Sequence, residues 1–151
     1  MPFWAKAGWF FAYKSEKWRP LREYEYRKQR YAYLKQVEPI LGTIDILKVS
    51  RTSNDARLAL AVQTPDRWKG IAERVRQLNA DAKAAAIAIR NLSRPRFFAS
   101  DVRASMAAYA DAVADWSEAL SAMLDDPSRD MKLVDEKRKV IDVRYAEVSL
   151  K

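Results

Sequence analysis

The chain has 151 residues, with 28 Lys and Arg against 20 Asp and Glu, so its formal net charge is +8. It contains no Cys, no His and only 3 Gly, which excludes disulfides, Ser-His or Cys-His catalytic pairs, the usual zinc sites and the glycine-rich phosphate loops. We therefore expect no catalytic residues, no metal site, no cofactor and no small-molecule substrate.

The length predicts a single domain over residues 1–151, large enough to bury a substantial core. No stretch reaches the ~18–20 apolar residues of a membrane span. The apolar start lacks the basic region and the small-residue cleavage site of a signal peptide. These features favour an intracellular, virion or membrane-peripheral protein and leave the compartment open.

The first 33 residues contain 11 of the 17 aromatic residues, interleaved with Lys and Arg. We expect residues 1–15 to form an aromatic docking segment, followed by a helix from about Glu16 to Val37. Trp, Tyr and Arg are typical anchors of protein interfaces. The alternatives are insertion of residues 3–18 into a membrane interface, stacking on single-stranded nucleic acid, or folding back onto the chain's own core. The predicted partner-docking residues are Trp4, Trp9, Phe10, Phe11, Trp18, Tyr24 and Tyr31.

The segment from 44 to 63 shows a different pattern. Residues 58–63 alternate large and small side chains, residues 44–49 are rich in β-branched side chains, and residues 50–55 are rich in turn-formers. This pattern predicts a small β-hairpin. Two short helices are the alternative, because Leu41, Ile44 and Leu47 also fit one helical face.

Two segments, about 66–92 and 101–124, are predicted to form an antiparallel helical hairpin. Thr64-Pro65-Asp66 and Ser100-Asp101 are helix-start patterns, and the connection between the segments is short enough to make them antiparallel neighbours. Apolar residues follow at alternating steps of three and four, as in a coiled-coil seam. On the first segment these are Trp68, Ile71, Val75, Leu78, Ala82, Ala85, Ile89 and Leu92, and on the second Val102, Met106, Tyr109, Val113, Trp116, Leu120 and Met123.

A last helix is expected from about Arg129 to Val148, which makes the predicted fold mainly α. Val134 and Ile141 belong to one apolar face of this segment. Leu133, Val140 and Val143 belong to another. Two faces suggest contact with more than the hairpin.

Charged residues recur every seven positions on both segments of the hairpin. Asp111, Glu118 and Asp125 form an acidic row on the second segment, with Asp115 close by, and a solvated face is the simplest interpretation. The first segment carries a basic row with about 10.5 Å between neighbours, which predicts binding to an anionic surface of nucleic acid or lipid, with a solvated helix face as the alternative. The residues of this basic row are Lys69, Arg76, Lys83 and Arg90.

These observations favour a non-enzymatic structural or assembly subunit of a larger protein complex, such as a virion or a membrane complex. Its expected partners are other protein subunits, as a hetero- or homo-oligomer, met through the aromatic-basic N-terminus and the heptad helices. One alternative is a basic helical nucleic-acid-binding subunit of a ribonucleoprotein or DNA complex. The other is a peripheral membrane subunit anchored by residues 3–18.

Overall fold

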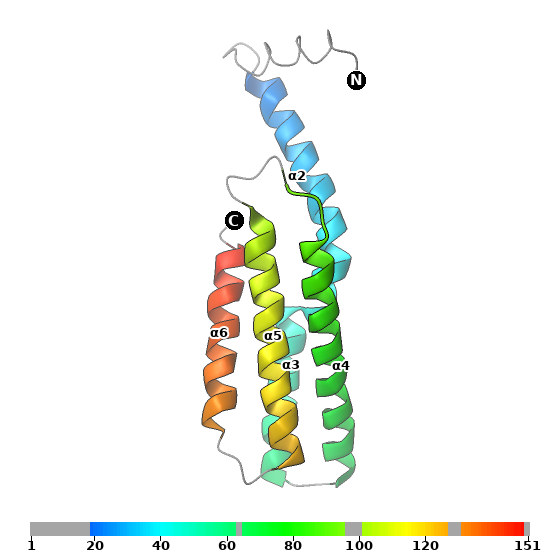
Figure 1. The fold of residues 1–151 in the computed structure, drawn as a ribbon, viewed down its shortest axis with the longest axis vertical. Helices are drawn as coiled ribbons and strands as arrows, with labels where there is room; N and C mark the ends of the chain where they lie inside the picture. Colours follow the sequence, from blue (N-terminus) through cyan, green and yellow to red (C-terminus); the bar gives the residue numbers. More distant parts are fainter. Residues whose placement is uncertain (1–18, 63–64, 96–100, 127–130, 150–151) are drawn as a thin grey trace.

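The structure, a computed structural model, describes residues 19–62, 65–95, 101–126 and 131–149, and all regular secondary structure within them is helical. The mainly α prediction is confirmed. Figure 1 shows the elements in order: α2 (Arg19–Leu41), the 3-10 turn η2 (Gly42–Ile44), α3 (Ile46–Val62), α4 (Pro65–Arg90), α5 (Val102–Asp125) and α6 (Lys132–Ser149).

Helices α4 and α5 pack against each other as the predicted antiparallel hairpin (Figure 1). The register follows from three links along their length, which are given in order. Trp68 Nε1 donates a hydrogen bond to the Leu124 carbonyl at 3.0 Å, Asn79 Nδ2 to the Ala114 carbonyl at 2.9 Å, and Arg90 forms an ion pair with Asp111 at 2.5 Å. Along these links the residue number on α4 rises while the residue number on α5 falls, so the two helices are antiparallel.

Helices α3 and α6 complete an up-down four-helix bundle around this hairpin. Helix α3 runs antiparallel to α4, with Arg74 paired to Asp55 at 2.6 Å and Lys48 to Asp81 at 3.9 Å. On its other side α3 meets α6, where Arg138 Nη2 donates to Ser50 Oγ at 3.1 Å. Helix α6 packs on α5, and the four helices therefore enclose one common core.

Helix α5 is the centre of that core. All seven of its predicted seam residues are buried, and so are small residues on its other sides, including Ser105, Ala107, Ala112 and Ser117. Small side chains let neighbouring backbones approach α5 closely on several sides. The seam residues predicted on the first segment of the hairpin are buried as well, except Trp68 on α4 and Leu92 just beyond its end. These two are partly buried against the core.

The predicted β-hairpin over 44–63 is wrong, because this segment forms the single helix α3 and no strand occurs in the described parts of the chain. The Asp45 carboxylate accepts a hydrogen bond from the Leu47 backbone N–H at 2.8 Å and so caps the first turn. The turn-forming residues 50–55 stay helical because the buried positions of α3 follow the helical steps of three and four. These buried positions are Val49, Thr52, Ala56 and Ala59.

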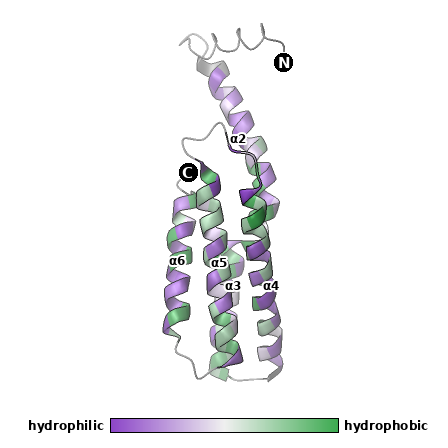
Figure 2. Ribbon diagram, viewed as in Figure 1, coloured by the Kyte–Doolittle hydropathy of each residue, from purple (hydrophilic) through white to green (hydrophobic). Residues whose placement is uncertain are grey.

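Helix α2 leaves the bundle at η2 and extends beyond the end of the other helices (Figure 1). Val37 is its one buried residue among those whose side chains are described, and Tyr33, Ile40 and Leu41 pack partly against the core. The part that projects beyond the bundle is mostly hydrophilic (Figure 2). Hydrophobic contacts with the bundle therefore hold α2 only through its C-terminal half.

The outer helices differ from their predicted bounds by a few residues. Helix α2 continues past Val37 because Pro39 lies close to the helix end, where it removes only one backbone hydrogen bond. The starts predicted at Glu16 and Arg129 lie outside the described residues. On α6, Val134 and Ile141 are buried, whereas the second predicted apolar face is exposed. That exposed face consists of Leu133, Val140 and Val143.

The buried Tyr109 hydroxyl joins α5 to η2 by donating a hydrogen bond to the Ile44 carbonyl at 2.6 Å. We expect Tyr109→Phe to lower the free energy of unfolding by about 1–3 kcal/mol, because it leaves this buried carbonyl without its donor. Denaturant unfolding measures the change. Tyr31→Phe on the exposed side of α2 is the control and should stay within about 0.5 kcal/mol of the parent; equal effects of the two variants would contradict the role given to Tyr109.

Candidate interaction surfaces

The first candidate surface is an aromatic-basic face on the projecting helix α2. Tyr24 and Tyr31 are 62% and 63% exposed, and Leu34 is 48% exposed. Helical spacing places all three on one side of α2, together with the exposed Lys28 and Lys35. We call Tyr24, Lys28, Tyr31, Leu34 and Lys35 the tyrosine face.

Lys35, a charged side chain of the tyrosine face, contacts residues of α2 itself and forms an ion pair with Glu38 at 3.6 Å. The Lys35 ammonium lies 5.3 Å from the centre of the Tyr31 ring, a cation–π contact. Tyr and Arg or Lys side chains together give large contact areas with a polar outer edge. Tyr33, also on α2, instead packs against the core, and burial raises its pKa above the ordinary value.

The predicted docking residues thus divide into two groups. Tyr24 and Tyr31 lie together on the tyrosine face. Leu34 and Lys35 were not predicted as docking residues, although their spacing of three and four from Tyr31 places them on the same helical face. Trp4, Trp9, Phe10, Phe11 and Trp18 lie outside the described residues.

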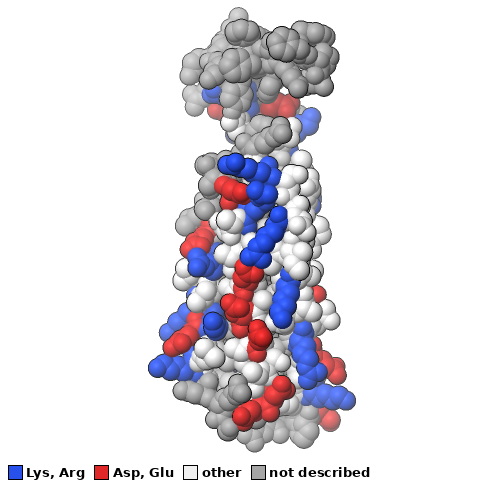
Figure 3. Space-filling view, in the orientation of Figure 1, with Lys and Arg blue, Asp and Glu red and all other residues white. Residues whose placement is uncertain are grey.

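The second candidate surface is the basic row of α4. Lys69, Arg76, Lys83 and Arg90 are all exposed, and Figure 3 shows Lys and Arg side chains following α4 down one face of the molecule. Within the described parts of the chain, the first three form no ion pair. The structure thus brings the four residues into one row, of which three charges are free.

The acidic row of α5 lies beside the basic row on the same face of the hairpin (Figure 3). Arg90 joins the two rows by its 2.5 Å ion pair with Asp111, and the hydrogen bond that Arg90 donates to this carboxylate raises the pKa of Arg90. The exposed Asp115 and Glu118 continue the acidic row. A large anionic partner that approaches α4 therefore also meets negative charge from α5.

A further cluster of charges caps the start of α5. The Asp101 side chain accepts a hydrogen bond from the Arg103 backbone N–H at 3.0 Å, while the Arg103 guanidinium pairs with the same carboxylate at 2.8 Å and donates to the Leu92 carbonyl at 2.8 Å. The side-chain hydrogen bonds from Arg103 lower the pKa of Asp101 from 3.8 to about 2. Arg103 thus links the first turn of α5 to the Leu92 carbonyl just beyond the end of α4.

The described residues offer few means for other chemistry. They contain no group of three or more metal-ligating side chains. No helix among them combines the length and the apolar character needed to cross a bilayer.

The Asp101–Arg103 pair predicts a defined response of stability to pH. Because the pKa of Asp101 is lowered to about 2 in the folded protein, its contribution is present above about pH 5 and is lost as the pH falls through about 2. We expect Asp101→Asn, which keeps a capping side chain, to be less stable than the parent at neutral pH and to approach it toward pH 2. Unfolding by denaturant across this range measures the difference.

The control for this prediction is Asp115→Asn, which removes an exposed carboxylate without an ion pair in the described chain. A stability difference between the parent and Asp101→Asn that stays constant from neutral to acid pH would contradict the prediction.

Comparisons with known proteins gave no match to this chain, whether against protein families, curated proteins or solved structures. Its function is therefore inferred from its sequence and from the surfaces described above.

Proposed function

We propose that this protein is a non-enzymatic structural subunit of a larger protein complex and that it docks through the tyrosine face of α2. The observation that carries the proposal is the exposure of this face: two tyrosines and a leucine are exposed along α2, the helix whose first turns extend beyond the bundle. Tyrosine is among the residue types enriched at protein interfaces and at their energetic hot spots.

The energetics of α2 support the same proposal. Short helices are marginal in water, and most helices in proteins are stabilised by packing of one face. The projecting part of α2 gains little packing from its own bundle, since only Val37 is fully buried on the described part of this helix. A partner that covers Tyr24, Tyr31 and Leu34 would supply the missing packing. The exposed Lys28 favours an acidic surface on that partner, whereas Lys35 is already paired with Glu38 at 3.6 Å.

A photo-crosslinking amino acid at position 31 tests the proposal. Expressed in the native cells, the full chain should form one or two discrete adducts with other proteins through position 31 and none through position 54, an exposed site on α3. Tyr24→Ala combined with Leu34→Ala should sharply reduce these adducts, because a buried tyrosine anchor contributes about 2 kcal/mol or more to binding. Circular dichroism checks that the helices remain formed.

Absence of adducts at position 31, or adducts that persist in the double variant, would refute docking through α2. Flotation of the full chain with lipid vesicles, lost on deletion of residues 1–18, would favour the membrane-anchored alternative instead.

Binding of nucleic acid is the second candidate function, favoured by Lys69, Arg76 and Lys83, which form no ion pair within the described residues. Their spacing along α4 suits the regular phosphates of a nucleic-acid backbone. The neighbouring acidic row opposes this function, and for this reason we rank it second.

Replacement of Lys69, Arg76 and Lys83 by Gln tests this second function. If the chain binds duplex DNA, the slope of log affinity against log salt should become shallower by about 0.9 for each lost phosphate contact. Fluorescence anisotropy with labelled DNA measures the slope. A matched variant with Lys132, Lys137 and Lys139 on α6 replaced by Gln should behave as the parent; no salt-sensitive binding by the parent would exclude the function.

A further inference from the structure

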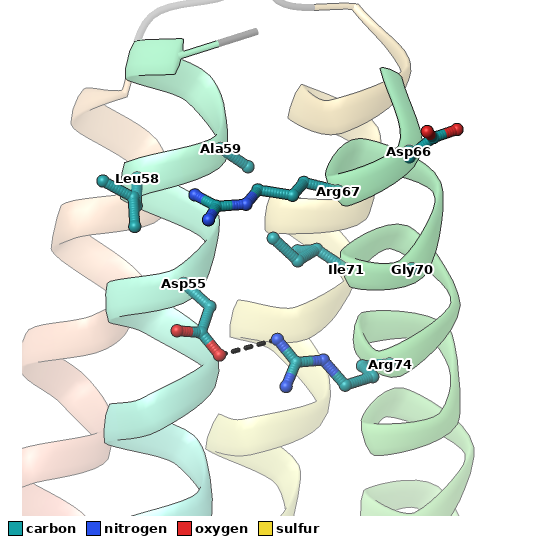
Figure 4. Close-up of a pocket in the computed structure, with 8 residues that line it drawn as sticks. All are labelled: Asp55, Leu58, Ala59, Asp66, Arg67, Gly70, Ile71 and Arg74. Carbon is teal, nitrogen blue, oxygen red and sulfur yellow. Dashed lines mark hydrogen bonds and ion pairs between the residues drawn. The ribbon is translucent and has the colours of Figure 1, made fainter. Parts of the chain in front are cut away.

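An open groove of about 440 Å³ lies between α3 and α4, at the end of the bundle opposite the projecting part of α2. Figure 4 shows its walls: Leu58 and Ala59 on α3, and Arg67, Gly70 and Ile71 on α4. The ion pair between Arg74 and Asp55 spans the two helices beside it. The tyrosine face and the basic row do not include this groove.

Gly70 is the first observation that points to an occupant. Glycine weakens a helix interior relative to alanine, and the described residues give no steric reason for it here, since a Cβ atom on Gly70 would meet no atom within 4 Å beyond its chain neighbours and the adjacent backbone of its own helix. Glycine in a helix also permits close approach of another chain to the backbone. Here the space that a side chain would fill is the groove itself.

Arg67 is the second observation. Figure 4 shows its side chain reaching across the groove toward α3, whereas Asp66 points away from it. The carboxylate of Asp55 is already engaged by Arg74. Within the described parts of the chain Arg67 has no ion-pair partner, so the groove offers one free guanidinium, a group suited to a carboxylate.

The apolar walls are the third observation. Leu58 is 52% exposed at the rim, and Val62, one turn further along α3, is 55% exposed. Ile71 is buried and forms the floor. An aliphatic side chain placed beside Gly70 would therefore cover apolar surface on both helices.

We propose that this groove binds a short amphipathic segment of a partner protein, which inserts an aliphatic side chain beside Gly70 and places a carboxylate on Arg67. The inference rests on the proposed role as an assembly subunit and adds a second docking site with its own chemistry. Charge complementarity selects an acidic segment, and the open space at Gly70 selects a side chain of about the size of leucine.

Selection of short peptides from a displayed random library on the purified full chain tests the proposal. The enriched peptides should contain an aliphatic residue within one helical turn of an Asp or Glu. Their affinity, measured by fluorescence anisotropy, should fall at least about tenfold in Gly70→Leu, which adds a side chain where a Cβ atom has open space, and about five- to tenfold in Arg67→Gln. Ala84→Leu, at another exposed position of α4, is the matched control and should bind as the parent.

The proposal is overturned if no peptide is enriched, or if the enriched peptides bind Gly70→Leu as well as the parent. Octanoate is tested beside the peptides by NMR. Binding of octanoate at Gly70 without any enriched peptide would assign the groove to small amphipathic anions and refute peptide docking. Variants Tyr24→Ala and Tyr31→Ala should leave peptide affinity unchanged, so failure of the groove and failure of the tyrosine face give different results.

Discussion

The fold depends on the need to cover α5 on several sides at once. An ordinary amphipathic helix buries one stripe, whereas α5 buries its heptad seam and also the small residues Ser105, Ala112 and Ser117 on other sides. Each of these sides needs a neighbour that approaches closely. Helices α4 and α6 supply the largest contacts with α5, and the junction at η2 adds the hydrogen bond from Tyr109 to the Ile44 carbonyl. A bundle is the arrangement in which all these contacts are made together.

The same constraint explains why α2 projects. The Ile44 carbonyl is fixed by Tyr109 in the core, and the capping of α3 by Asp45 starts a new helix directly after it. Helix α2 therefore ends where the chain steps sideways into α3, and its earlier turns pass beyond the bundle end (Figure 1). The exposed tyrosines are thus a consequence of where the chain is anchored, since Val37 and Ile40 pack inward while Tyr24 and Tyr31 have no core to reach.

The sequence predicts the α4–α5 hairpin because large apolar residues mark its seam at every third and fourth position. It fails for α3, whose buried positions are occupied by small or polar residues such as Thr52 and Ala56, while the large Leu47 and Leu58 are exposed. If the large apolar residues are assigned to the core, the segment shows alternation of large and small side chains instead of a helical face. The capping carboxylate of Asp45 was present in the sequence, yet one cap cannot outweigh a misleading pattern of side-chain size.

The surfaces show a related limit of periodicity. Spacing of seven correctly places Lys69, Arg76 and Lys83 in one row, but it gives no information about the neighbouring helix, whose acidic row lies alongside and engages Arg90. The groove depends on the same missing information, because Leu58 and Gly70 meet only through the packing of α3 on α4.

Since the tyrosine face and the groove lie at opposite ends of the long axis, a subunit that uses both would connect two neighbours instead of capping one. Two different partner proteins at these ends would be bridged by one copy of the chain, and the chain would then act as a connector between them.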